Sequence, residues 1–96
     1  MTKADLITQI SENTGIGRAT VRITVEAFMA TIKNSLEKGE NVYLRNFGTF
    51  QIKKRAKKLA RDISKNTSVI IPAHYIPSFK PSETFVSLVK NNNTIS

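Results

Sequence analysis

The sequence predicts a small α+β domain, and three features support this prediction. Apolar residues recur at helical spacing within residues 1–40, and they alternate with a period of two from residue 41 onward. A polar segment at residues 62–66 separates two strand-like segments, which indicates a hairpin. A helical pattern returns at residues 81–90. We therefore expect two N-terminal helices, a three-stranded antiparallel sheet with a long protruding β-arm, and a short C-terminal helix.

The chain is short enough to be a single domain with a limited core. It has 96 residues, of which 40% are hydrophobic, and a domain of this size buries a modest fraction of its surface. Dimerisation would enlarge that core. The expected division is a helical dimerisation base at 1–40, the sheet and the arm at 41–80 with its tip at 61–66, a helix at 81–90 and a tail at 91–96.

Several classes of protein are excluded by what the sequence lacks. There is no cysteine, which rules out disulfides, thiolate metal sites and a cysteine nucleophile. His74 is the only histidine, and no Ser-His-Asp pattern, phosphate-binding glycine loop or pair of acids is present. We therefore expect no enzyme activity, no metal and no cofactor. The N-terminus lacks the apolar run of a signal peptide and no segment reaches transmembrane length, so we expect a cytoplasmic protein without a membrane partner.

The placement of charge points to a polyanion as the partner. Residues 1–40 hold five basic and five acidic residues, whereas residues 41–96 hold ten basic residues and only Asp62 and Glu83. The whole net charge of +8 therefore lies in the second part of the chain. Such asymmetry is typical of a surface that binds a polyanion. The alternative is a soluble protein that is merely basic, but a scattered excess would not leave the first 40 residues neutral.

The two N-terminal helices have recognisable ends. Thr2 can cap the first helix together with Asp5, three residues later, and Gly15 is a suitable stop. The second helix is expected to begin near Arg18 and to end at Gly39. One face of it is apolar, formed by Val21, Val25, Phe28, Met29, Ile32 and Leu36.

The basic segment after the first strands is the main candidate site. Asn46-Phe47-Gly48 predicts a turn, and a strand beginning near residue 48 leads into six basic residues within residues 53–61. Helix propensity alone would favour a helix there, but the flanking strand patterns predict one long hairpin that turns near 62–66 and returns through 67–76. A continuous strand would place Lys53, Arg55, Lys57, Leu59 and Arg61 on one face and Lys54, Ala56, Lys58 and Ala60 on the other. Both faces carry charge, so the hairpin must project into solvent or lie along a polyanion.

These residues together resemble the HU/integration host factor family of bacterial histone-like DNA-binding proteins. The resemblance rests on Asn46-Phe47-Gly48-Thr49-Phe50, on the basic strand with Arg61 at the tip, on Ile71-Pro72-Ala73, and on Pro77-Ser78-Phe79. It extends from about Thr2 to Lys90 without an obvious insertion. It implies an intertwined homodimer, or a heterodimer with a paralogue, that bends double-stranded DNA with two β-arms in the minor groove. The implied setting is the nucleoid, and RNA is a further possible ligand.

The resemblance and the charge pattern assign roles to particular residues. The candidate DNA-binding residues are Lys53, Lys54, Arg55, Lys57, Lys58 and Arg61, followed by Lys80 and Lys3 on the resemblance alone. Ile63 is the candidate intercalating wedge. The candidate dimer core comprises Phe28, Met29, Ile32, Phe47, Phe50 and Phe79. Base stacking on Phe47, Phe50, Phe79 and Phe85 is the alternative, but their positions beside turns and on apolar faces favour a core.

The chain departs from the family pattern in three places. The arm tip has Arg61-Asp62-Ile63 where the family usually has Arg-Asn-Pro, so the wedge lacks the fixed φ of proline. Lys65-Asn66 replaces Thr-Gly, and Asn tolerates the same turn. Glu83 lies where a basic residue is common, which weakens contacts with flanking DNA. We expect these changes to affect how strongly the protein bends DNA more than how tightly it binds DNA.

Three other functions remain open on the sequence. A site-preferring DNA-bending factor of the integration host factor type would share all these features. A basic-arm module that binds an acidic protein would share the charge. A helix-turn-helix reader would use the first two helices, but only Arg18 and Arg22 there suit a recognition surface. We favour largely sequence-nonspecific, architectural DNA binding and bending.

Overall fold

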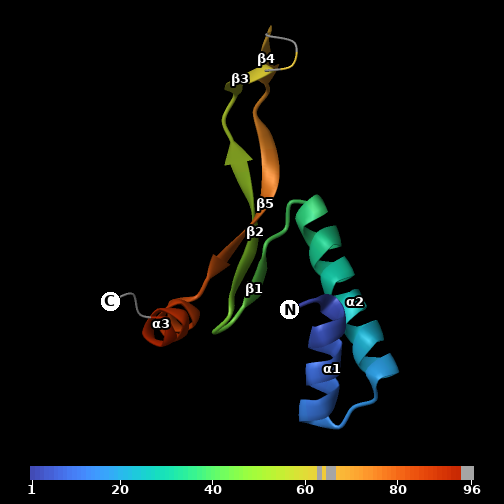
Figure 1. The fold of residues 1–96 in the computed structure, drawn as a ribbon. Coiled ribbons are helices and arrows are strands. Elements are labelled where there is room, and N and C mark those ends of the chain that lie inside the picture. Colours follow the sequence, from blue (N-terminus) through green and yellow to red (C-terminus); the bar gives the residue numbers. More distant parts are fainter. Residues whose placement is uncertain (63, 65–66, 94–96) are drawn as a thin grey trace. The chain divides into compact units, whose positions relative to one another are not determined.

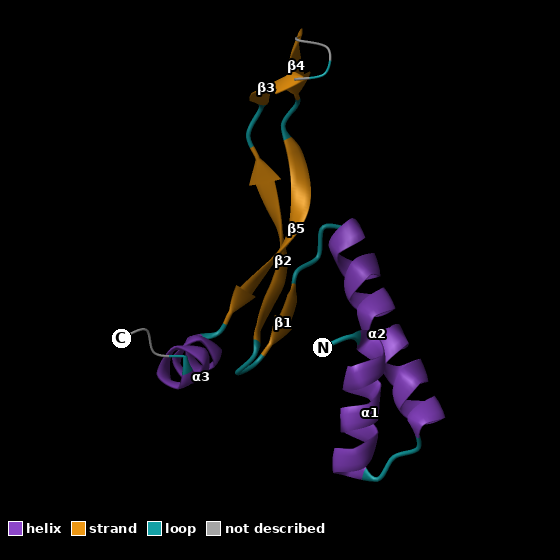
Figure 2. Cartoon of the chain, viewed as in Figure 1, coloured by secondary structure: helices purple, strands orange, loops and turns teal. Residues whose placement is uncertain are grey.

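The computed structural model describes residues 1–62, 64 and 67–93. It contains three helices and five strands in this part of the chain, in the order α1-α2-β1-β2-β3-β4-β5-α3 (Figures 1 and 2). The chain divides into two compact units, Met1–Ser35 and Leu36–Ser96. The α+β prediction is confirmed. Within the described ranges, no helix is long and apolar enough to cross a membrane.

The first unit is a helical hairpin whose ends follow the sequence signals. Helix α1 spans Lys3–Thr14 and begins with a complete capping box between Thr2 and Asp5. It ends at Gly15, whose φ of 76° is the left-handed value that glycine adopts without strain. Helix α2 spans Arg18–Glu37. The buried apolar side chains of this unit are Ile7, Val21 and Ile32.

The second unit is built on a three-stranded antiparallel sheet of order β1-β2-β5. Strand β1 spans Val42–Leu44, β2 spans Gly48–Arg55 and β5 spans His74–Pro81. Strand β1 pairs only with the first residues of β2, from Gly48 to Phe50. Beyond that point β2 and β5 continue as a two-stranded ribbon in the described part of the chain. Pro77 lies in β5, an edge strand, where a residue without an N–H is tolerated.

The ribbon continues into a second hairpin, so the long β-arm is present. Strand β3, Lys58–Asp62, pairs with β4, Thr67–Ile71, in a register that runs from Lys58 opposite Ile71 to Asp62 opposite Thr67. We call residues 53–76 the arm. Its pairing matches the predicted hairpin that turns between residues 62 and 67.

Two details of the prediction are wrong. The strand through residues 53–61 is not continuous, because β2 ends at Arg55 and β3 begins at Lys58. The gap lies opposite Pro72 and Ala73; since proline has no N–H to donate to a ladder, the pairing stops there. The C-terminal helix α3 spans Glu83–Asn92 rather than beginning at residue 81, because Pro81 belongs to β5. Ser82 caps α3 by accepting a hydrogen bond from the Phe85 backbone N–H at 3.2 Å.

Candidate nucleic-acid interface

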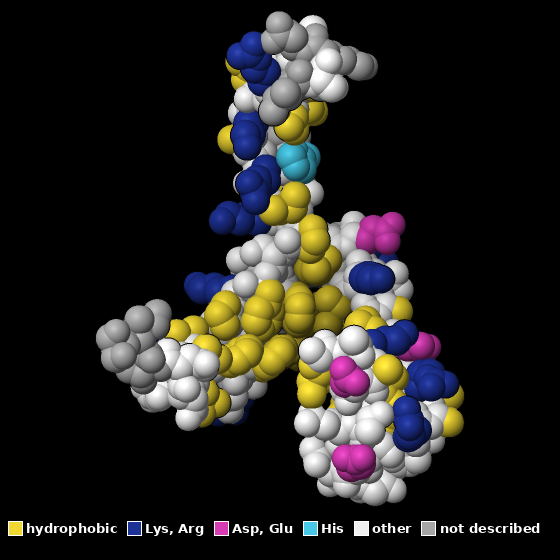
Figure 3. All heavy atoms as spheres, in the orientation of Figure 1, with side chains coloured by type: hydrophobic (Ala, Val, Ile, Leu, Met, Phe, Trp, Pro, Cys, Tyr) yellow, Lys and Arg dark blue, Asp and Glu magenta, His cyan; other side chains and the backbone are white. Residues whose placement is uncertain are grey.

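The basic residues that the structure describes in the arm are exposed and lie on its outgoing half. Lys53, Lys54 and Arg55 belong to β2, Lys57 lies in the gap between the strands, and Lys58 and Arg61 belong to β3. Figure 3 shows the dark blue Lys and Arg side chains following the arm, with yellow hydrophobic side chains over the base of the sheet. All six are therefore accessible to a ligand.

Their neighbours across the ladder do not neutralise them. Lys53 lies opposite Ile76, Lys54 opposite Tyr75 and Arg55 opposite His74. Further along, Lys58 lies opposite Ile71 and Arg61 opposite Ser68. Among the described residues, no carboxylate pairs with Lys53, Lys54, Arg55, Lys57 or Lys58. Several positive charges in one strip without counter-charges produce a strong positive potential, which suits a polyanion.

The gap in the ladder brings two cations and the histidine together. A hollow of about 300 Å³ there is lined by Arg55, Ala56, Lys58, Ile71, His74 and Ile76. The His74 Nδ1 lies 2.9 Å from the Pro72 carbonyl oxygen. A carbonyl oxygen only accepts hydrogen bonds, so Nδ1 carries the proton and Nε2 remains for another partner. The interruption of the ladder thus places polar groups together at mid-arm.

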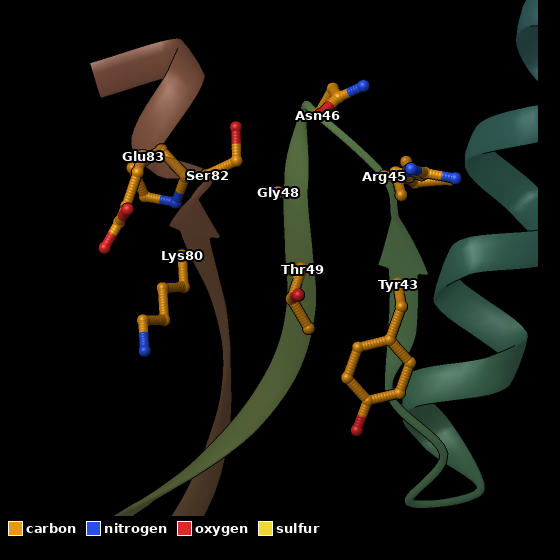
Figure 4. A pocket seen from close by; sticks show the side chains of 10 residues that line it. Tyr43, Arg45, Asn46, Gly48, Thr49, Lys80, Ser82 and Glu83 are labelled. Carbon is orange, nitrogen blue, oxygen red and sulfur yellow. The ribbon is translucent and has the colours of Figure 1, made fainter. Parts of the chain in front are cut away.

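The sheet at the base of the arm has one polar and one apolar face. The register places Tyr43, Thr49 and Lys80 in one row across β1, β2 and β5, and Figure 4 shows this row. The neighbouring row, Val42, Phe50 and Phe79, points to the opposite face because side chains alternate along a strand. Lys80 therefore projects from the polar face of the sheet.

A hollow on this polar side includes one acidic residue. Its volume is about 500 Å³, and its lining residues are Tyr43, Leu44, Arg45, Asn46, Gly48, Thr49, Lys80, Pro81, Ser82 and Glu83. Arg45 and Lys80 make the site basic, whereas Glu83 lies at the start of α3 and opposes them (Figure 4). Glu83 is one of the three places at which the sequence departs from the expected family pattern.

The two remaining predicted contacts have less support. Lys3 lies in the helical unit, where its Nζ is 3.1 Å from Oε1 of Glu26, so its charge is already compensated. Both side chains are half exposed, and such a pair adds little stability. Ile63, the predicted wedge, lies outside the described residues.

The predicted core aromatic residues of the second unit gather in one cluster. The ring centroid of Phe47 lies 5.1 Å from that of Phe79 and 5.4 Å from that of Phe85. Phe50 lies 4.8 Å from Phe79. These distances are typical of packed aromatic pairs. Mutual packing of this kind favours a core over base stacking.

The cluster is nevertheless incomplete within one chain. Phe47 retains 43% of its exposure and Phe79 retains 36%. In the helical unit, Phe28 and Met29 are also exposed, whereas Ile32 is buried. Within the second unit, Phe79 and Phe85 also line an apolar hollow of about 490 Å³, together with Pro81, Val86, Val89 and Lys90. Contiguous exposed apolar surface of this kind marks an interaction site.

Comparison with known proteins identifies the family. The family model described as "Bacterial DNA-binding protein" matches residues 1–90. The chain belongs to this family. It is the family of HU-type histone-like proteins, as the resemblance in the sequence predicted. The family is architectural rather than enzymatic, which confirms that the chain is not an enzyme.

Named relatives and solved structures agree with this assignment. The DNA-binding protein HU of Thermus thermophilus is 34% identical over 90 residues, covering 94% of this chain and 93% of the relative. HU of Staphylococcus aureus is also 34% identical, covering 94% and 100%. The HU chain of an Anabaena HU–DNA cocrystal structure matches with a TM-score of 0.89 and 26% identity, covering 94% and 98%. A variant HU of Thermotoga maritima matches with a TM-score of 0.72 at 26% identity, covering 94% and 100%.

Sequence reasoning missed two features of this HU-type interface. The polar row of Tyr43, Thr49 and Lys80 depends on which strands pair, and residues 43 and 80 are far apart in the chain. The alternation of Tyr43 and Arg45 with Val42 and Leu44 in the sequence could have indicated that this strand has one polar and one apolar face. The second feature is that residues 67–79 contain no Lys, Arg, Asp or Glu. In the sequence, the basic residues that precede this segment are the more conspicuous feature.

Proposed function

We propose that this HU-type protein is a dimeric architectural factor that binds double-stranded DNA with little regard to sequence and bends it. Its two arms enter the minor groove, and its role is the organisation of bacterial DNA in the cytoplasmic nucleoid. The observation that carries the proposal is the strip of exposed arm cations without counter-charges, from Lys53 to Lys58.

The proposed affinity comes mainly from phosphate neutralisation. Each cation that meets a phosphate releases condensed counterions, so binding falls steeply with salt. Arginine also enters a narrow minor groove, which makes Arg55 and Arg61 the candidates for groove contacts. The minor groove distinguishes little beyond A·T from G·C, so contacts there give little sequence specificity.

The incomplete core supports dimerisation. In one chain, Phe28, Met29, Phe47 and Phe79 keep between about a third and a half of their surface exposed. A second copy of the chain would cover these apolar side chains, and a homodimer supplies the two arms that an embrace of the duplex needs. Small domains commonly need such association to gain a sufficient core.

Bending is the costly part of the proposed activity. Smoothly bending a short site costs about 1–6 kcal/mol, and contacts of both arms with the duplex must offset this. An apolar wedge at Ile63 would lower the cost by unstacking one base step. Lys80 and Arg45 on the polar side of the sheet would hold the flanking DNA, with Glu83 weakening that contact.

The test is energy transfer between dyes at the two ends of a short duplex as protein is added. Several unrelated sequences are compared at one salt concentration, and binding is followed separately by anisotropy. We expect transfer to rise for every sequence at similar protein concentrations. Binding without a rise in transfer would refute bending, and binding to one sequence alone would refute nonspecific recognition.

A further inference from the structure

The returning half of the arm has a different character from its basic outgoing half. Residues 67–79 contain no Lys, Arg, Asp or Glu. Strand β4, with the sequence Thr-Ser-Val-Ile-Ile, is exposed along its whole length. A function in phosphate binding does not account for an exposed apolar strand, so β4 needs a separate explanation.

One edge of β4 is open. Strand β4 pairs with β3 on one side, and within the described ranges no strand lies along its other side. Proteins usually protect such edges with charges, prolines or bulges. Strand β4 has none of these between Thr67 and Ile71, and its three last residues are β-branched. Short segments of this composition readily pair with another strand.

Each flat side of the same hairpin carries apolar side chains beside its charged ones. Leu59 lies opposite Ile70, and their side chains are 69% and 60% exposed. On the other side, Ala60 lies opposite Val69. Strand pairing along the open edge would bring further apolar side chains beside these pairs, and cross-strand apolar contacts stabilise a sheet.

We propose that β4 of one copy pairs edge to edge with β4 of a second copy, so that the arms of separate dimers join in a four-stranded ribbon. The distribution of charge favours the β4 edge over the β3 edge for this pairing. Strand β3 carries Lys58 and Arg61, so pairing through β3 edges would oppose cations. Pairing through β4 leaves the two β3 strands on the outside, three strand spacings apart. That separation is about 14 Å, which exceeds the Debye length of about 8 Å at physiological salt.

The joined arms would connect two DNA molecules, a consequence that rests on the proposed function. Each dimer would hold one duplex, and the β4 pair would bridge them. The pairing of the two β4 strands should depend on salt in the opposite way from DNA binding. Because the contact is apolar and the two chains each carry a net charge of +8, added salt screens their repulsion and strengthens association, whereas it weakens binding to DNA.

The first experiment is sedimentation velocity of the full chain without DNA, at about 0.1 M and at several-fold higher salt. We expect a species with twice the mass of the dimer, increasing with protein and with salt. Ile70→Lys should raise the dissociation constant of that species about tenfold or more, because a lysine at the edge opposes strand pairing. Ser68→Lys should act in the same way, as a second variant at the same edge.

The matched control is Ile23→Lys, which makes the same exchange at a 69% exposed isoleucine of α2. This variant should associate as the unchanged protein does. Absence of the larger species in the unchanged protein would overturn the proposal, and so would equal association of Ile70→Lys and Ser68→Lys with the control. Far-ultraviolet circular dichroism establishes that each variant is folded.

A second experiment separates self-association from DNA binding. A bead-bound duplex is saturated with protein, and capture of a second, labelled duplex is measured beside binding of a single duplex. We expect Ile70→Lys to reduce capture of the second duplex by a much larger factor than it changes binding of a single duplex, which is measured on the same beads. Failure of all proteins to bind a single duplex would refute the proposed function, while the sedimentation result would still decide the pairing of β4.

Discussion

Gly48 and Phe79 are so close that a side chain at position 48 would overlap the Phe79 ring. A Cβ atom on Gly48 would lie 2.5 Å from Cζ of Phe79 and 2.6 Å from the Lys80 carbonyl oxygen. Gly48 is buried at the start of β2, directly after the turn that carries Phe47. The glycine in the Asn46-Phe47-Gly48 turn is therefore required for packing of β2 against β5.

The first prediction concerns this contact. Gly48→Ala should lower the free energy of unfolding by about 1–3 kcal/mol, as overpacking of a closed site usually does. Urea unfolding at a fixed protein concentration measures the change. Gly17→Ser is the control, because a Cβ at Gly17 meets nothing within 4 Å. Equal stability of both variants would show that β5 moves aside without cost.

The second prediction concerns the aromatic cluster and the dimer. Phe47→Ala should destabilise the protein by about 3–5 kcal/mol, because Phe47 packs on Phe79 and Phe85 and is expected to be covered by the second copy. The loss should be larger at low protein concentration, since dimer stability depends on concentration. Thermal unfolding over a range of concentrations checks both points.

The control for Phe47 is Tyr43→Ala. Tyr43 is a similarly large residue that is 74% exposed on the polar side of the sheet. Its removal should leave stability nearly unchanged. A loss for Phe47→Ala as small as that for Tyr43→Ala would place Phe47 outside any interface.

The third prediction concerns pH and the start of α1. The Thr2 backbone N–H donates to Oδ2 of Asp5 at 2.9 Å, and hydrogen bonds from Thr2 lower the pKa of Asp5 below its ordinary value of 3.8. A depressed pKa in the folded state stabilises the fold above the unfolded-state pKa, and this stability is lost as pH falls through the folded value. Asp5→Asn should therefore be less stable than the unchanged protein near neutral pH, and the difference should shrink in acid.

Urea unfolding between about pH 3 and pH 6 tests this dependence. Glu12→Gln removes a carboxylate from the same helix outside the cap and serves as the control. A stability difference between Asp5→Asn and the unchanged protein that stays constant with pH would show that the cap does not depend on the charge of Asp5.

The features predicted well from sequence are those that local chemistry determines. Thr2, Asp5 and Gly15 set the ends of α1 through contacts within four residues, and the same holds for the turn at Asn46. The break in the arm was missed because it depends on what lies across the ladder, where Pro72 and Ala73 face residues 56 and 57. The 43% exposure of Phe47 in one chain was likewise not readable from local sequence, because the pairing of β2 with β5 decides which side chains surround it.

The fourth prediction tests the tip of the arm. Ile63→Ala should reduce the bend angle with little change in affinity for unbent DNA, because alanine is too small to unstack a base step. End-to-end energy transfer on the bound duplex measures the bend. Ile63→Pro restores the residue usual in the family and should bend at least as strongly as the unchanged chain. An equal bend in Ile63→Ala would exclude Ile63 as the wedge.

The fifth prediction tests the arm cations. Replacing Lys57, Lys58 and Arg61 together by glutamine should weaken binding to all duplexes alike. The proposed dimer presents two arms, so up to six phosphate contacts would be lost, and the slope of log K against log salt should become shallower by up to about 5.4, at about 0.9 per contact. Anisotropy titrations at four or five salt concentrations give this slope.

The matched control removes the same charge from the neutral half of the chain. Arg22, Lys33 and Lys38 are exposed on or just after α2, and their replacement by glutamine lowers the net charge by the same amount. If binding depended on net charge alone, both triple variants would lose affinity equally. If the arm contacts the DNA, the control should keep nearly the full salt slope, because long-range attraction is largely screened beyond about 8 Å at physiological salt. An unchanged slope in the arm variant would remove these three residues from the interface and leave Lys53, Lys54 and Arg55 as the remaining arm contacts.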